Sequence, residues 1–317
     1  MKHKTLKNLL CALALTAVYP LVSASHAAPT TNAQPPSGIA QPQESRASTS
    51  INGTDATTSP THHTPTRAVT LTPHITELLF AAGAGDIIVA TVTSSDYPPA
   101  ARSIPRIGDG MNVNVERIIA LKPDLVIAWQ PAGAAQTLAP TLDRLNIPLI
   151  YSQPKTLQDI SDQIAQFGQL FGTQAIAAPT AAHLRQRLKT LEERYTTRKP
   201  VSVFIEVGTA PLYTIGGDPL LNDALRLCGG INLYAQSALA APQISTESIL
   251  VKQPDVIITA DIDPAQLQQR RQEWAALHLA AATQGHIYAI DPDALFRPGP
   301  RLIGATEELC QYLDQAR

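Results

Sequence analysis

The sequence predicts an α/β protein with two lobes, each with a central parallel-type sheet flanked by helices, bridged by one long helix. Three observations lead to this fold class. Short apolar runs of strand character alternate with helical stretches over residues 67–317, a pattern typical of parallel sheets covered by helices. One sequence motif occurs twice, and a long helical stretch lies between its two copies. The predicted order along the chain is therefore lobe, helix, lobe.

The long helical stretch covers residues 173–198, which are filled with Ala, Leu, Arg, Gln, Lys and Glu, all good helix formers. Its apolar residues recur at three- and four-residue steps, at Ala181, Leu184, Leu188 and Leu191. Pro179 is expected in the first turn, where a missing N–H costs little. At about 1.5 Å per residue, the helix reaches roughly 30 Å, the width of a small domain.

The repeated motif consists of residues 116–128 and 247–259, which align without a gap at an offset of 131 residues. Both copies have a Glu at the start, a Pro-Asp pair in the middle and matching Ile residues. Each copy has the pattern of a short helix, a turn and a buried apolar strand. A repeat of this length indicates a duplicated lobe rather than a short solenoid unit.

The first lobe is assigned to residues 67–155. Strands are expected at residues 68–71, 86–92, 125–128 and 148–151. Helices are expected from Pro73, with Thr72 as N-cap, to Gly83, then at the start of the repeat, and at residues 138–145. Residues 95–99 are expected to form a loop.

The connecting segment is assigned to residues 156–199, with a helix at 156–171 ahead of the long one. The second lobe is assigned to residues 200–317. Its strands are expected at residues 201–207, 256–259 and 286–290. Its helices are expected at residues 220–227, at the start of the second copy of the repeat, and at residues 267–277 and 301–313.

Residues 1–27 have the parts of a secretory signal peptide, with a basic start, an apolar core at 9–22 and a small-x-small end at Ser25 and Ala27. A transmembrane anchor is the alternative, but the apolar run is shorter than the roughly 20 residues that a spanning helix needs. Residues 28–66 are rich in Thr, Pro, Ser, Ala and Gln, and we expect a disordered linker. The sequence therefore predicts export to the periplasm.

The cysteine content is also consistent with export to the periplasm. Cys11 lies in the signal peptide, so the exported chain keeps Cys228 and Cys310. An even pair in an exported chain suggests a disulfide, with two buried free thiols as the alternative.

Composition and motifs favour a binding protein. The net charge of −2 does not indicate the excess of basic residues that is typical of nucleic-acid-binding proteins. The chain has no Gly-x-Ser-x-Gly elbow, no phosphate loop and no His-Glu-x-x-His motif, so we predict no catalytic residue and no metal site. His74 follows a strand at the end where ligands of open α/β sheets bind, although it also fits an ordinary first-turn residue. The less favoured hypothesis is that the protein is an exported enzyme with the same two-lobed fold.

Several short segments resemble the family of iron-siderophore and cobalamin substrate-binding proteins of bacterial ABC importers. They are residues 95–99 (SDYPP), 114–118, 121–129, 228–230 (CGG) and 242–245 (PQIS), and the similarity extends from about Arg67 to the C-terminus. The resemblance implies two lobes bridged by one long helix. It also implies a receptor that passes its ligand to an inner-membrane permease with its ATPase. We expect a monomer without a cofactor of its own, with cobalamin as ligand and a ferric siderophore or haem as alternatives.

The resemblance also implies site residues. Ligand contacts are expected at Trp129, Ser94, Tyr97, Asp293, Ala294, Leu295, Phe296 and Arg297, the last five forming one loop. His74 is added to them because of its position at the end of a strand. Ser94, Gly110, Val207 and Ala241 stand where the cobalamin binder has aromatic residues. The alternatives without a ligand role are that Trp129 is a core residue and that Arg297 is a solvated charge in a loop.

Permease docking is expected at Glu116 and Glu247, which occupy equivalent positions in the two copies of the repeat. Asn114 and Ser245 are good N-caps, which places each Glu in a first helical turn. A purely structural role is the alternative, because a first-turn Glu stabilises its helix by roughly 0.3–1 kcal/mol through the helix dipole.

Overall fold

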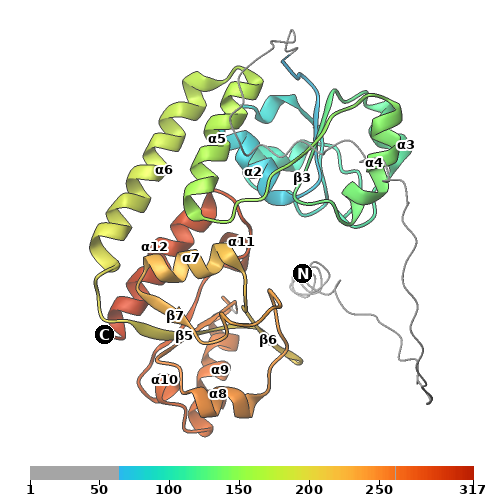
Figure 1. Cartoon of the computed structure of the whole chain (residues 1–317). Coiled ribbons are helices and arrows are strands. Elements are labelled where there is room, and N and C mark those ends of the chain that lie inside the picture. Colours follow the sequence, from blue (N-terminus) through green and yellow to red (C-terminus); the bar gives the residue numbers. More distant parts are fainter. Residues whose placement is uncertain (1–63, 261) are drawn as a thin grey trace, which may run out of the picture. The chain divides into compact units, whose positions relative to one another are not determined.

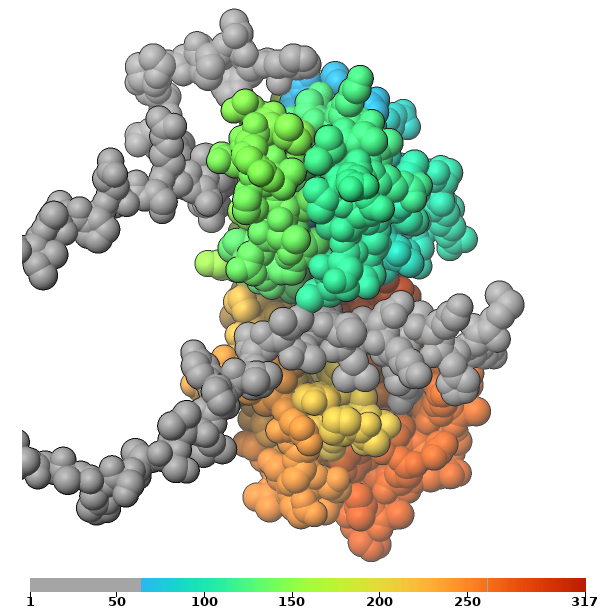
Figure 2. Space-filling view, turned by 90° about the vertical axis from the view of Figure 1, so that its right-hand side faces the viewer, coloured from blue at the N-terminus to red at the C-terminus, as the bar shows by residue number. Residues whose placement is uncertain are grey.

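The computed structural model describes residues 64–260 and 262–317 of the 317-residue chain (Figure 1). The predicted signal peptide and most of the predicted linker lie outside the described residues. Within the described part of the chain, none of the helices combines the length and apolar character needed to cross a membrane. The two lobes are separate in Figure 2, where the first lobe is blue to green and the second lobe is yellow to red.

The first lobe is built on a parallel sheet of order β2-β1-β3-β4. The strands are β1 (Ala68–Thr70), β2 (Ile88–Ala90), β3 (Leu125–Ala128) and β4 (Leu149–Tyr151). The helices are α2 (Pro73–Ala81), α3 (Val115–Ala120) and α4 (Ala134–Arg144), with 3-10 turns at η1 (Gly85–Ile87) and η2 (Pro99–Ser103). Every residue of β1 and β3 is buried, as expected for strands covered on both faces.

The second lobe has a mixed sheet of order β6-β5-β8-β9, in which β7 also pairs with β5. The strands are β5 (Val201–Thr209), β6 (Leu212–Thr214), β7 (Gly230–Asn232), β8 (Val256–Thr259) and β9 (Ile287–Ala289). The helices are α7 (Pro219–Leu227), α8 (Thr246–Lys252), α9 (Pro264–Ala276), α10 (Ala280–Thr283), α11 (Pro292–Leu295) and α12 (Arg301–Gln315).

One strand of the second sheet departs from the parallel arrangement. Strand β6 pairs antiparallel with β5, because the chain turns back directly after β5. Sequence alternation alone did not predict β6 or β7, which are each three residues long. The other pairings in both sheets are parallel, so the expected fold class is confirmed.

Helices α5 (Leu157–Phe171) and α6 (Gln174–Tyr195) connect the lobes and lie side by side (Figure 1). The predicted apolar face of α6 is confirmed, since Ala181, Leu184, Leu188 and Leu191 are all buried. The expectation that Pro179 lies in the first turn is wrong. Helix α5 ends at a left-handed Gly172, and α6 begins at Gln174, which leaves Pro179 in the second turn of α6.

The two copies of the repeat have the same local structure, α3 followed by β3 and α8 followed by β8. Lys122 and Gln253 occupy equivalent positions and both have a left-handed backbone, with φ of 48° and 46°. Asp124 and Asp255 of the Pro-Asp pairs accept backbone N–H hydrogen bonds of 2.8–2.9 Å from the start of the neighbouring strand. The Pro-Asp pair therefore fastens each motif to its sheet, which supports duplication of the lobe.

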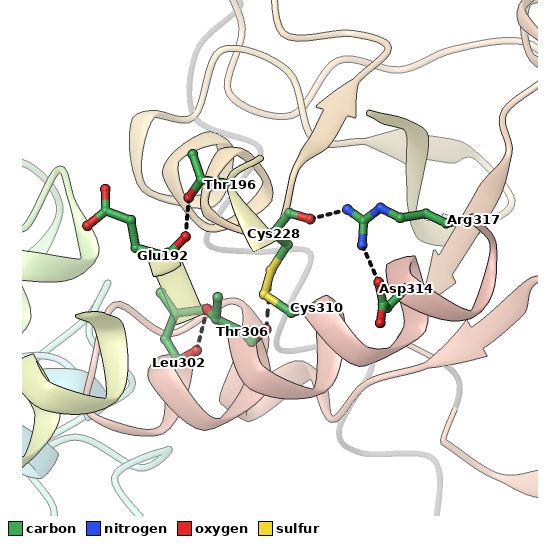
Figure 3. The surroundings of a disulfide bond; sticks show 8 residues. All are labelled: Glu192, Thr196, Cys228, Leu302, Thr306, Cys310, Asp314 and Arg317. Atoms are coloured by element: carbon green, nitrogen blue, oxygen red, sulfur yellow. Dashed lines mark hydrogen bonds and ion pairs between the residues drawn. A yellow bond between two sulfur atoms is a disulfide. The ribbon is translucent and has the colours of Figure 1, made fainter. Parts of the chain in front are cut away.

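The predicted disulfide between Cys228 and Cys310 is present, and it joins the end of α7 to α12 (Figure 3). The two Cα atoms are 4.6 Å apart, and both residues are fully buried. The free-thiol alternative is therefore wrong. The bond closes a loop of 82 residues within the second lobe.

Removing this bond is expected to lower the free energy of unfolding by about 2–4 kcal/mol, because the unfolded chain gains conformational entropy. Urea denaturation of the oxidised protein and of the Cys228→Ala/Cys310→Ala double variant measures the difference. Intact mass after alkylation under non-reducing conditions is the control, and the native protein should carry no alkyl group. Two alkylated thiols in the exported protein would contradict the assignment.

Candidate functional site

Most of the predicted ligand residues lie where parallel strands end. The chain that leaves β1 carries His74, the chain that leaves β2 carries residues 94–97, and β3 leads directly to Trp129. In the second lobe, the chain that leaves β9 leads to α11 and Arg297. Ligands of open α/β sheets bind at these carboxyl ends. The ion pairs described below join the two edges, so the edges face each other.

Trp129 is not a core residue, because 37% of its surface is exposed. Its ring meets the His74 ring edge to face, with 5.7 Å between centroids and an interplanar angle of 80°. His74 lies in the first turn of α2 and is only 2% exposed. His74 therefore supports the Trp129 ring and offers a ligand almost no surface of its own.

The imidazole of His74 is held in its neutral form. Burial lowers the pKa of His74 to about 3, a hydrogen bond with the backbone of Ser152 opposes this shift, and the charge of Arg297 adds to it. The Nε2 atom has no hydrogen-bond partner among the described residues. A neutral ring is thus available to pack against Trp129 at any physiological pH.

Five charged residues meet between the lobes and form what we call the interlobe cluster. Its members are Glu77 and Asp96 from the first lobe, and Asp293, Arg297 and Arg301 from the second. Glu77 is 3% exposed and accepts two hydrogen bonds from Arg301, of 2.9 and 2.7 Å. Arg297 lies 2.6 Å from a carboxylate oxygen of Asp293 and 3.2 Å from one of Asp96.

These contacts neutralise the arginines. Arg297 faces three carboxylates and its side chain is 15% exposed, so the alternative of a solvated loop charge is wrong. Burial raises the pKa of Glu77, and the hydrogen bonds from Arg301 oppose the rise. Burial likewise raises the pKa of Asp293, against the charge of Arg297. With all five groups ionised, the cluster carries one more negative than positive charge and holds little attraction for an anion.

Tyr97 lies beside the interlobe cluster and is 45% exposed. The guanidinium carbon of Arg301 is 4.4 Å from the centroid of its ring, a cation–π contact. Ser94 is half-buried in the same segment. Arg301 therefore couples the buried carboxylate of Glu77 to an exposed aromatic ring.

A buried network of hydroxyl groups anchors this segment. Thr70, Thr76, Thr91 and Ser95 are at most 1% exposed and hydrogen-bond to one another over 2.7–3.2 Å. The network joins β1, α2 and the end of β2, so it fixes the point from which Asp96 and Tyr97 extend. No sequence motif had singled out these residues.

The segment 293–297 differs from the expected ligand-binding loop. Asp293, Ala294 and Leu295 belong to the short helix α11, and Leu295 is 1% exposed in the hydrophobic core. The expectation that Leu295 contacts a ligand is therefore wrong, because its side chain turns inward to fill that core. Ala294 and Phe296 are half-buried and pack against the same core, which leaves Asp293 and Arg297 as the polar groups of the segment.

Glu116 and Glu247 are exposed in the first turns of α3 and α8. The predicted caps are confirmed, since Asn114 accepts a hydrogen bond from the N–H of Arg117 and Ser245 accepts one from that of Ser248. Hydrogen bonds with its own backbone and with the Ser245 side chain lower the pKa of Glu247. Glu247 is therefore ionised at neutral pH.

The chain that leads into each of these helices runs beside the outermost strand of its sheet. The chain before α8 pairs with β6, the outermost strand of the second sheet, through a bridge between Tyr213 and Gln243. The chain before α3 continues the edge next to β2, the outermost strand of the first sheet, where Thr91 bridges to Arg106. Each lobe thus presents one exposed acid in the first turn of the helix that follows such a segment.

Among residues 64–260 and 262–317, no group of His, Cys, Asp and Glu could hold a metal ion.

Comparison with known sequences gives consistent matches. Residues 69–294 match the family described as periplasmic binding protein. The chain is 37% identical over 251 residues to the vitamin B12-binding protein of Vibrio cholerae, an alignment that covers 79% of this chain and 90% of that protein. It is 34% identical over 250 residues to the vitamin B12-binding protein of Photorhabdus laumondii, covering 79% and 88%.

Solved structures show the same similarity. The periplasmic vitamin B12-binding protein BtuF of Vibrio cholerae superposes with a TM-score of 0.73 at 35% identity, over 80% of this chain and 98% of that one. The periplasmic haem-binding protein RhuT from Roseiflexus, in its apo form, superposes with a TM-score of 0.67 at 27% identity, over 79% and 99%. Two relatives with different ligands thus share the fold.

Proposed function

The chain belongs to the periplasmic binding protein family, and we propose that it is the substrate-binding protein of an ABC importer that binds cobalamin between its two lobes. The proposal rests mainly on Trp129, whose side chain is partly exposed between the lobes. Arg297 lies at the same edge, and its charge is balanced by ion pairs with Asp96 and Asp293. The names of the two curated relatives support the same ligand. The ligand would pass to an inner-membrane permease with its ATPase.

The interlobe cluster favours a neutral ligand. Ferric siderophores and haem commonly carry anionic groups, which need an arginine with free positive charge. Here Arg297 already has carboxylate partners, and the cluster as a whole has a negative excess. Cobalamin carries neutral amide side chains, which can donate to Asp293 and accept from Arg297. The macrocycle itself offers an apolar face to the Trp129 ring.

Docking to the permease is assigned to Glu116 and Glu247. Both are exposed, and each lies in the first turn of the helix that begins one copy of the repeat. A two-fold permease would meet the two acids with one basic site on each subunit. We place the protein in the periplasm as a monomer, with residues 1–27 as the signal peptide that directs export.

Trp129→Ala is expected to raise the Kd for cobalamin at least tenfold, about 1.4 kcal/mol or more, because the ligand loses an aromatic contact face. Isothermal titration calorimetry with cyanocobalamin, haemin and a ferric siderophore measures the effect and ranks the ligands. Trp129→Phe is the control, since it keeps an aromatic ring and should lose less. Unchanged affinity in a folded Trp129→Ala variant would place the ligand elsewhere, and tighter binding of haemin than of cyanocobalamin would favour the haem alternative.

A further inference from the structure

Ile262 is a large apolar residue that the fold leaves uncovered. It follows β8 closely, and 57% of its surface is exposed. Its N–H donates to the carbonyl oxygen of Ala260 over 3.1 Å. The next residue, Asp263, caps α9 by accepting hydrogen bonds from the first backbone N–H groups of that helix. Ile262 is thus held between the end of a strand and a capped helix.

The position of Ile262 is set by the second sheet. Strand β8 runs parallel to β9, with Thr259 paired to Ala289, so the chains that leave the two strands emerge at the same edge. The chain that leaves β9 leads to Arg297, which contacts carboxylates of the first lobe. Ile262 therefore lies at the edge of the second sheet that faces the first lobe, whose own facing edge carries Trp129.

The internal repeat gives an independent comparison. At the offset of 131 residues, Ala260 is the counterpart of Trp129, and both directly follow a strand in which every residue is buried. The second lobe therefore has a small side chain where the first has an exposed aromatic ring. The first large apolar side chain beyond that point is Ile262.

A structural role does not account for its exposure. A hydrophobic residue just before an N-cap often packs against the fourth residue of the helix, here Leu267. Leu267 packs against the core cluster around Phe204 and Trp274, whereas more than half of the Ile262 surface stays in contact with solvent. Single exposed apolar residues are ordinary on protein surfaces. This one, however, stands at the carboxyl end of a central strand, where ligands bind.

We propose that Ile262 is a specificity-determining residue of the ligand site and packs on the face of the ligand opposite Trp129. The inference rests on the proposed function. The macrocyclic ligand would then lie between an aromatic side chain of the first lobe and an aliphatic side chain of the second. A ligand without apolar atoms on the side that faces Ile262 would lose the second contact, so Ile262 gives the site selectivity for ligands with apolar groups on both sides.

The test is calorimetric titration with cyanocobalamin of the native protein, Ile262→Ser and Val251→Ser. Val251 is the matched control, because it is 84% exposed on α8 and has no place at the carboxyl ends of the strands. Ile262→Ser should weaken binding roughly three- to tenfold, mainly through faster dissociation, because the ligand loses buried apolar area. Val251→Ser should bind like the native protein, and Ile262→Leu should keep most of the affinity.

Tryptophan fluorescence adds a second readout. Trp274 is 2% exposed, so contact quenching by bound cyanocobalamin reports mainly on Trp129. Ile262→Ser should shift the midpoint of the quenching curve and keep its amplitude, since the ligand still reaches Trp129. Native affinity for cyanocobalamin in both Ile262→Ser and Ile262→Gln would overturn the inference and leave the proposed function standing. A native protein that does not bind cyanocobalamin would overturn both.

Discussion

Replacing Glu116 and Glu247 together by arginine is expected to abolish ligand uptake while ligand binding stays intact. Both side chains are exposed in the first turns of α3 and α8, so the fold tolerates the change. The internal repeat places one acid on each lobe. Reversing both charges would set like charges against the basic sites that we propose on the permease, and like-charge contacts cost several kcal/mol in an interface.

The measurement is uptake of labelled cobalamin by cells in which the variant is the only receptor, alongside calorimetric titration of the purified variant. Glu192→Arg/Glu193→Arg on α6 is the matched control, because both residues are exposed and the change in net charge is the same. Association with the permease should also slow, and more so at low salt. Normal uptake by the double variant would contradict the docking role. A defect confined to thermal stability would support the helix-dipole role instead.

The features of the fold that could be predicted depend on residues that are close together in the sequence. The apolar periodicity of α6 needs only its own sequence, and the capping residues of α3 and α8 act within one turn. The duplicated motif adds a second copy against which each assignment can be checked. Trp129 could be placed for the same reason, since the end of a buried strand is a local feature.

The parts that were not predictable depend on distant partners. Glu77 and Arg301 are 224 residues apart, and nothing around either residue indicates that they meet. Leu295 lies in a segment whose other apolar residues, Ala294 and Phe296, stay half-buried, and only packing against distant parts of the chain makes Leu295 a core residue. Strand β6 is short, and its direction is set by the turn after β5 rather than by its composition. The start of α6 depends on where α5 ends, which decided the position of Pro179.

The pair of Glu77 and Arg301 leads to the second large effect. Glu77→Gln is expected to lower the free energy of unfolding by about 2–4 kcal/mol, since breaking a buried ion pair leaves an uncompensated charge. The value lies below that for a fully buried pair because the Arg301 side chain is 20% exposed and water can reach it. Arg297 also loses a carboxylate at 3.8 Å, so two cations remain against Asp96 and Asp293.

Glu307→Gln is the matched control for this experiment. Glu307 also accepts two hydrogen bonds from one arginine, Arg187, both of 2.7 Å, but the two side chains are 30% and 31% exposed. The same substitution should therefore cost no more than about 1 kcal/mol there. Urea denaturation of both variants, with the disulfide intact, measures the difference. Equal losses in the two variants would mean that burial between the lobes adds nothing to the Glu77 pair, and that the interlobe cluster does not hold the lobes together.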